Sequence, residues 1–154
     1  MKDLCLTIVR LSLAGWVGGA GLFVVTSVRE QVAPDFDHQT RAALALVRFP
    51  AYYLFGFALL GTAFVAGVVG FDPARFGRGR RWLCLGLVLA ALAVTAVDYV
   101  WVYRPLESML EQPPALRPAT FNAYHAMSES INLAHVGLSF AAACAACWPS
   151  RGAS

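Results

Sequence analysis

The chain has 154 residues, of which 58% are hydrophobic and only 14% are charged. An average soluble domain carries about 25% charged residues, so this composition excludes an ordinary water-soluble domain. The formal net charge of +3 comes mainly from arginines in one short segment, and no stripe of basic residues with interleaved aromatic side chains is present. We therefore expect a protein whose main partner is the lipid bilayer and that does not bind nucleic acid.

Four long apolar segments follow one another along the chain. A helix of about 20 apolar residues crosses the hydrocarbon core of a bilayer, and each segment reaches that length. We expect an all-α integral membrane protein, an antiparallel four-transmembrane-helix bundle that forms a single domain over residues 1–154. The expected spans are residues 4–28, 49–70, 82–103 and 121–148.

Small residues are concentrated in the first two spans. Ala14 and Gly18, like Gly15 and Gly19, are four residues apart, a spacing that lets two helix backbones approach closely in lipid. In the same span, we expect Arg10 to reach the nearer membrane surface, with a role as a buried counter-ion as the alternative. The predicted helix-packing glycines of both spans are Gly15, Gly18, Gly19, Gly56 and Gly67.

A polar segment, residues 29–48, separates these two spans. Helical spacing of His38, Arg41 and Arg48 predicts a short helix that lies on the membrane surface or extends the second span. Pro50 suits the first turn of that span.

The loop between the second and third spans predicts the orientation. Short loops dense in arginine stay in the cytoplasm, and the segment 71–81 holds Arg75, Arg78, Arg80 and Arg81 against the single acid Asp72. In a four-span chain both termini lie on the side of this loop. We therefore expect an inner (cell) membrane protein with both termini cytoplasmic, consistent with Lys2 and Arg151.

Polar side chains follow one face of the fourth span. At about 100° per residue they fall within an arc of roughly 140°; they are Asn122, His125, Ser128, Glu129, Asn132, His135 and Ser139. Such a stripe cannot face lipid, so it must face other helices or a water-filled cavity.

Asp98 in the third span also needs a partner at its depth. We expect this acid and the stripe to form a polar cavity in the outer half of the membrane, because acids and histidines there are the groups that make proton relays and cation sites. The alternative is that the stripe holds neighbouring helices together by hydrogen bonds. The candidate ion-binding residues are Asp98, His125, Glu129, Asn132, His135 and Ser139.

Four cysteines lie near the expected cytoplasmic ends of the spans: Cys5, Cys84, Cys144 and Cys147. Thiolates gathered there would bind Cu(I) or Zn. The alternative is that they are buried as small apolar side chains. No phosphate loop, nucleophile elbow or metalloprotease motif occurs, so we expect neither an enzyme nor a cofactor.

Three short motifs resemble a known family. They are the Gly-Trp-Val-Gly-Gly-Ala run at 15–20, the Phe-Pro-Ala-Tyr-Tyr run at 49–53, and the spaced set Phe121, His125, Ser128, Asn132 and Leu133. The chain resembles the transmembrane protein 205-like family over residues 10–147, with a weaker similarity to the membrane domain of copper-resistance D proteins. The resemblance implies a small four-helix membrane protein and assigns no site residue.

Two functions remain open from the sequence. The first is a small protein that binds or transports a cation or metal ion through the outer polar cavity. The second is a non-catalytic structural or accessory subunit, which docks by its glycine and alanine faces onto a membrane-protein partner or a second copy of itself.

Overall fold

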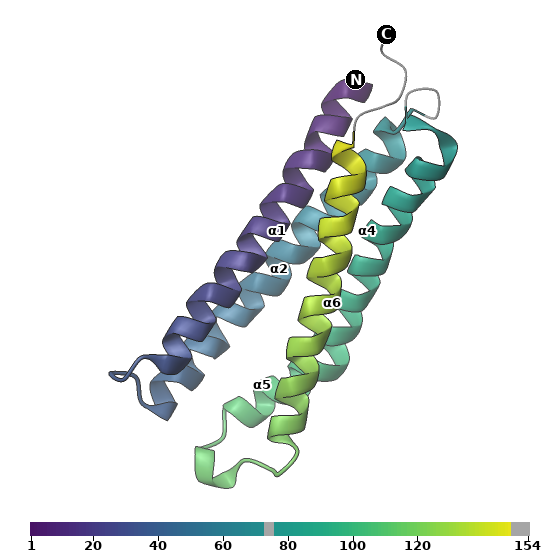
Figure 1. Cartoon of the computed structure of the whole chain (residues 1–154). Helices are drawn as coiled ribbons and strands as arrows, with labels where there is room; N and C mark the ends of the chain where they lie inside the picture. The colour runs from purple at the N-terminus through teal and green to yellow at the C-terminus, as the bar shows by residue number, and fades with distance from the viewer. Residues whose placement is uncertain (73–75, 149–154) are drawn as a thin grey trace.

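The computed structural model describes residues 1–72 and 76–148, and this part of the chain is helical with no strand. Long helices run antiparallel in one bundle (Figure 1). The elements are α1 (Lys2–Val32), α2 (His38–Gly70), α4 (Arg78–Asp98), a π-helix (Tyr99–Tyr103), α5 (Arg104–Leu110), a 3₁₀ turn (Pro114–Leu116) and α6 (Phe121–Cys147). Within the described residues, four helical arms are long and apolar enough to cross a membrane. The predicted all-α four-helix bundle is confirmed.

The helices are longer than the expected spans. α2 begins at His38, so the polar segment before residue 49 extends the second span and does not form a separate surface helix. Asp37 caps this helix by accepting a 2.7 Å hydrogen bond from the backbone N–H of Thr40, and this bond holds the pKa of the Asp37 carboxyl below its ordinary value. Pro50 lies inside α2, so the prediction that it opens a helix was wrong. The third arm likewise continues through the π-helix into α5 and ends at Leu110.

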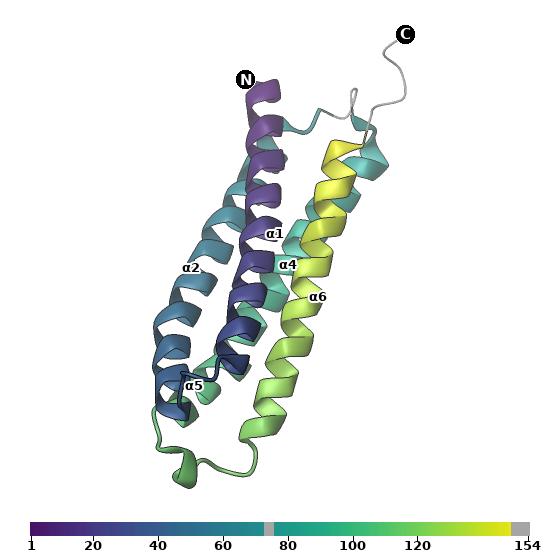
Figure 2. The same ribbon diagram turned by 60° about the vertical axis from the view of Figure 1, so that its left-hand side comes forward.

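The four arms form a closed ring. α1 packs on α2 and α4 packs on α6, while contacts of α1 with α6 and of α2 with α4 complete the ring (Figure 2). The N-terminus, the end of α2 and the start of α4 lie at one end of the bundle, where α6 also ends; the α1–α2 connection and α5 lie at the other (Figure 1). We call the latter the α5 end. An even number of crossings places the first and last helix ends together, as the sequence predicts.

Large aromatic side chains fill the interior. Trp16 is fully buried, and its ring centroid lies 5.0 Å from that of Tyr52 and 5.7 Å from that of His135. Tyr53 and Tyr103 pack with their ring centroids 4.8 Å apart. These rings join the four helices in one core.

The predicted packing glycines differ in what they face. Cβ atoms added at Gly19 and Gly56 would lie 2.7 Å from the Phe55 ring and 2.8 Å from the Trp16 ring. At Gly15 and Gly67 the nearest atoms belong to Leu59 at 3.5 Å and to Leu85 and Phe71, each at 3.0 Å. These four positions therefore accept a neighbouring helix or side chain closely.

Gly18 has nothing within 4 Å of an added Cβ, so its predicted packing role was wrong. Among the described glycines, the tightest position is instead Gly70, where an added Cβ would overlap the Cβ of Cys5 and lie 3.3 Å from its Cα. α1 and α2 are thus in close contact near the end that holds the N-terminus.

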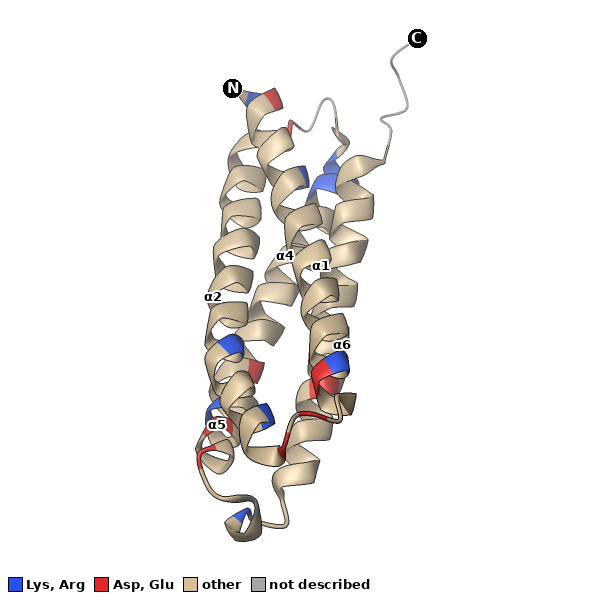
Figure 3. Ribbon diagram, turned by 90° about the vertical axis from the view of Figure 1, so that its left-hand side faces the viewer, with Lys and Arg blue, Asp and Glu red and all other residues tan. Residues whose placement is uncertain are grey.

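Basic residues are present at this same end (Figure 3), and two arginines there bind the C-terminus of α6. Arg10 donates from Nε to the Ala146 carbonyl at 3.0 Å, and Arg80 donates from Nε to the Ala145 carbonyl at 2.7 Å. The last carbonyls of a helix have no partner within the helix and attract cations. Arg10 is therefore a helix cap at the end of the bundle nearer to it. Arg75 and Arg151 lie outside the described residues.

Candidate functional site

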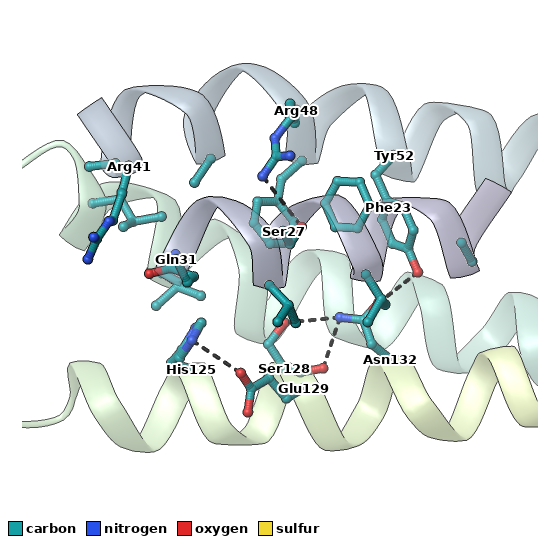
Figure 4. Close-up of a pocket in the computed structure, with 18 of the residues that line it drawn as sticks. Phe23, Ser27, Gln31, Arg41, Arg48, Tyr52, His125, Ser128, Glu129 and Asn132 are labelled. Atoms are coloured by element: carbon teal, nitrogen blue, oxygen red, sulfur yellow. Dashed lines mark hydrogen bonds and ion pairs between the residues drawn. The ribbon is translucent and has the colours of Figure 1, made fainter. Parts of the chain in front are cut away.

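A cavity of about 750 Å³ lies toward the α5 end, between α1, α2 and α6 (Figure 4). Leu106, Leu110 and Arg117 contribute to its lining from α5 and the segment before α6. Along α1 the lining runs from Ala20 to Val32, about 18 Å at 1.5 Å per residue. Its volume lies within the range of about 300–1,000 Å³ that is typical of small-molecule sites.

Most of the cavity wall is apolar. Phe23 stacks on Tyr52 with ring centroids 4.4 Å apart and forms part of the deeper wall. Other apolar lining residues come from all three helices and include Val24, Val28, Phe49, Leu133 and Val136. The interior of the cavity therefore suits a hydrocarbon group.

Arg48 lies beside this wall and is neutralised. Its guanidinium is 2.6 Å from each carboxylate oxygen of Glu30, and it stands 5.4 Å from the centre of the Phe23 ring. Its Nη2 also lies 3.4 Å from the Ser27 hydroxyl. A two-point pair of this kind holds the charge in a fixed position on α1 and α2.

Two other arginines line the cavity and have no carboxylate as an ion-pair partner among the described residues. Arg41 donates to the Ala33 carbonyl at 3.0 Å, while Arg117 donates to the Leu110 carbonyl at 3.5 Å and stands 5.0 Å from the centre of the Phe121 ring. Neither has an ion-pair partner in the described part of the chain, and the Nε of each is buried there without a hydrogen-bond acceptor. Unpaired buried donors of this kind favour an incoming acceptor.

The part of the polar stripe from His125 to Asn132, nearer the α5 end, faces the cavity. His125 Nε2 lies 3.3 Å from Glu129 Oε1 at the rim, where the Glu129 side chain is 70% exposed. Deeper, Asn132 accepts a 2.9 Å bond from the Tyr52 hydroxyl and donates to the Ser128 carbonyl at 2.9 Å (Figure 4). The polar groups at the deep end are thus paired with one another.

The rest of the stripe, farther from the α5 end, is buried in the core. His135 and Ser139 are fully buried and do not line the cavity. His135 Nε2 lies 2.9 Å from Asn132 Oδ1, and the Ser139 hydroxyl donates to the His135 carbonyl at 2.7 Å. These two residues therefore lie outside the shared cavity that the sequence suggested.

Asp98 is also separate from the cavity. It is fully buried, and its Oδ2 accepts a 2.6 Å bond from the Tyr53 hydroxyl. Glu129 faces the cavity rim instead and pairs with His125. The expectation that the two acids meet in one cation site is not met, because Glu129 pairs with His125 at the exposed rim while Asp98 is buried against Tyr53 of α2.

The cysteines do not form a thiolate cluster. Cys5 is half-buried against Gly70, and Cys84 is buried with its Sγ 3.6 Å from the Ala142 carbonyl. Cys144 and Cys147 are exposed. Among the described residues, no three His, Cys, Asp or Glu side chains lie close enough to hold a metal ion.

Several residues around the cavity were not anticipated. Tyr52 and Tyr53 were singled out only as part of the run at 49–53, whereas their hydroxyls bond to Asn132 and Asp98. Two adjacent tyrosines in an apolar span do carry a signal, because each buried hydroxyl needs a partner. Arg41 and Arg117 had no such signal, since they are 76 residues apart and meet one cavity only in the fold.

Comparison of the chain with family models, with curated proteins and with solved structures finds no match.

Proposed function

We propose that this multi-pass membrane protein binds an amphiphilic small molecule in the cavity between α1, α2 and α6. The supporting observation is the polarity of the lining, which is mostly apolar along its length and basic at the α5 end. One leaflet of the hydrocarbon core is about 15 Å thick, close to the length of the cavity along α1. A single acyl chain would fit such a space.

The deep end of the cavity supports an apolar tail. The Tyr52 hydroxyl and the Asn132 side-chain oxygen are already hydrogen-bonded to each other there at 2.9 Å. A hydrocarbon chain entering the deep end would therefore not deprive either group of a hydrogen bond. Leu133 and Val136 extend the wall beyond this pair.

The charges of the lining favour an amphiphile over the cation that the sequence suggests. Of the three arginines that line the cavity, Arg48 is paired with Glu30, so the unpaired lining charges are Arg41 and Arg117 against Glu129, the one lining acid among the described residues. A cation entering this space would meet repulsion. Cation binding is therefore the second candidate, supported by Glu129 and His125 at the rim. The subunit hypothesis and the resemblance to the transmembrane protein 205-like family stay predictions.

We also infer that both termini are cytoplasmic, so that the cavity lies on the outer side of the membrane. Support comes from Arg78, Arg80 and Arg81 in the α2–α4 region, at the end that holds the N-terminus. Arginine-dense short loops stay inside.

A cavity-filling variant tests the amphiphile proposal. Gly21 lines the cavity and has nothing within 4 Å of an added Cβ, so Gly21→Phe should occupy the space without a clash in the core. Gly86 is equally open but does not line the cavity, which makes Gly86→Phe the matched control.

The measurement is the Kd of a single-chain lipid with a fluorescent tail for the detergent-purified protein. We expect Gly21→Phe to weaken binding by about tenfold or more, equivalent to about 1.4 kcal/mol, and Gly86→Phe to leave the Kd unchanged. Equal affinities for the two variants would contradict binding in this cavity.

A further inference from the structure

We propose that the bound amphiphile is a lipid with an anionic phosphate headgroup, and that Arg41 and Arg117 hold the phosphate. This inference rests on the proposed function and specifies its ligand. It begins from position: Arg41 is in the first turn of α2, and Arg117 lies four residues before α6 begins. Both therefore reach the cavity at the α5 end, and Figure 4 shows Arg41 at the end away from Tyr52.

The two guanidinium groups have donors to spare. A guanidinium carries five N–H donors, whereas the contacts described above engage one backbone carbonyl for each of Arg41 and Arg117. The Nε of each is buried without an acceptor in the described residues. A phosphate group has the acceptor oxygens that such donors need.

Arg48 differs from this pair. Glu30 occupies both of its terminal nitrogens at 2.6 Å. Once Arg48 is set against Glu30, the lining charges that remain are Arg41, Arg117 and Glu129. Glu129 faces His125 and is largely exposed at the rim, so it offsets the two arginines only in part. The cavity end is complementary to an anion.

The apolar wall identifies a lipid as the source of the phosphate. The lining continues from the arginines past Phe23 and Val24 to Leu133, and a free inorganic ion would leave this surface without a partner. A lipid fills both parts of the cavity at once, with its headgroup at the arginines and its acyl chain along the apolar wall.

The test compares two probes that share one acyl chain, lysophosphatidic acid and lysophosphatidylcholine. The variant is the double substitution Arg41→Gln with Arg117→Gln. The matched control is Arg104→Gln, because Arg104 is at the same end, is 62% exposed and does not line the cavity. Circular dichroism and gel filtration establish that each variant is folded.

We expect the unmodified protein to bind lysophosphatidic acid about tenfold more tightly than lysophosphatidylcholine, with a preference that decreases as salt is added. The double variant should lose this preference and keep its affinity for lysophosphatidylcholine, while Arg104→Gln keeps the preference. Equal binding of the two probes to the unmodified protein would overturn the headgroup assignment but leave the cavity proposal standing. Displacement of the lipid by an equal concentration of inorganic phosphate would show a free-anion site, and no binding of either probe would overturn both proposals.

Discussion

The hydroxyl of Tyr53 donates a 2.6 Å hydrogen bond to Oδ2 of Asp98 inside the bundle, where both residues are buried. The bond joins α2 to α4 at the residue where α4 passes into the π-helix. The other carboxyl oxygen, Oδ1, has no hydrogen-bond partner in the described residues. At this depth the bilayer offers no water in exchange, so Asp98 depends on Tyr53.

Removing the Tyr53 hydroxyl should therefore destabilise the fold. We expect Tyr53→Phe to lower the free energy of unfolding by about 1–3 kcal/mol, because it leaves a buried carboxyl without its partner. Unfolding in detergent, followed by circular dichroism, measures this loss. Adding Asp98→Leu to Tyr53→Phe should recover part of it, since both polar partners are then gone. Strictly additive losses in the double variant would contradict the pairing.

The two glycines Gly70 and Gly18 should respond in opposite ways to the same substitution. Gly70→Ala places a methyl group against the backbone of Cys5 and should cost about 1–3 kcal/mol of unfolding free energy, as overpacking typically does. Gly18→Ala meets nothing within 4 Å and should be neutral or stabilising by up to about 1 kcal/mol, because alanine favours the helix. Thermal unfolding of the two variants side by side measures the difference. A loss at Gly18 equal to that at Gly70 would place a helix contact at Gly18.

The orientation can be measured with single thiols at opposite ends of the bundle. Cys147 is exposed at the end of α6, and Ser108 is exposed in α5. We would compare a chain that keeps only Cys147 with a cysteine-free chain carrying Ser108→Cys. In right-side-out vesicles, a membrane-impermeant maleimide should modify the Ser108→Cys chain at once and the Cys147 chain only after permeabilisation, because short loops dense in arginine stay in the cytoplasm. The reverse pattern would place the termini outside.

Local amino-acid composition was enough to predict much of the fold. Span number, helix type and the common location of the first and last helix ends follow from apolar lengths and an even count of crossings, which depend only on neighbouring residues. The hydrophilic face of α6 could also be predicted from the sequence, because its residues recur at helical spacing. The sequence did not predict what this face contacts. Ser128 and Asn132 face a cavity, whereas His135 and Ser139, on the same face, are buried in the core.

The tertiary structure decided which helix faces meet. Gly18 and Gly19 are adjacent in the chain, yet only Gly19 lies against Phe55. Arg41 and Arg117 become one pair of cavity residues through the way α1, α2 and α6 pack. The rotation and tilt of each helix are set by contacts between side chains far apart in sequence. Apolar length is a property of one segment, whereas a cavity is a property of several helices together.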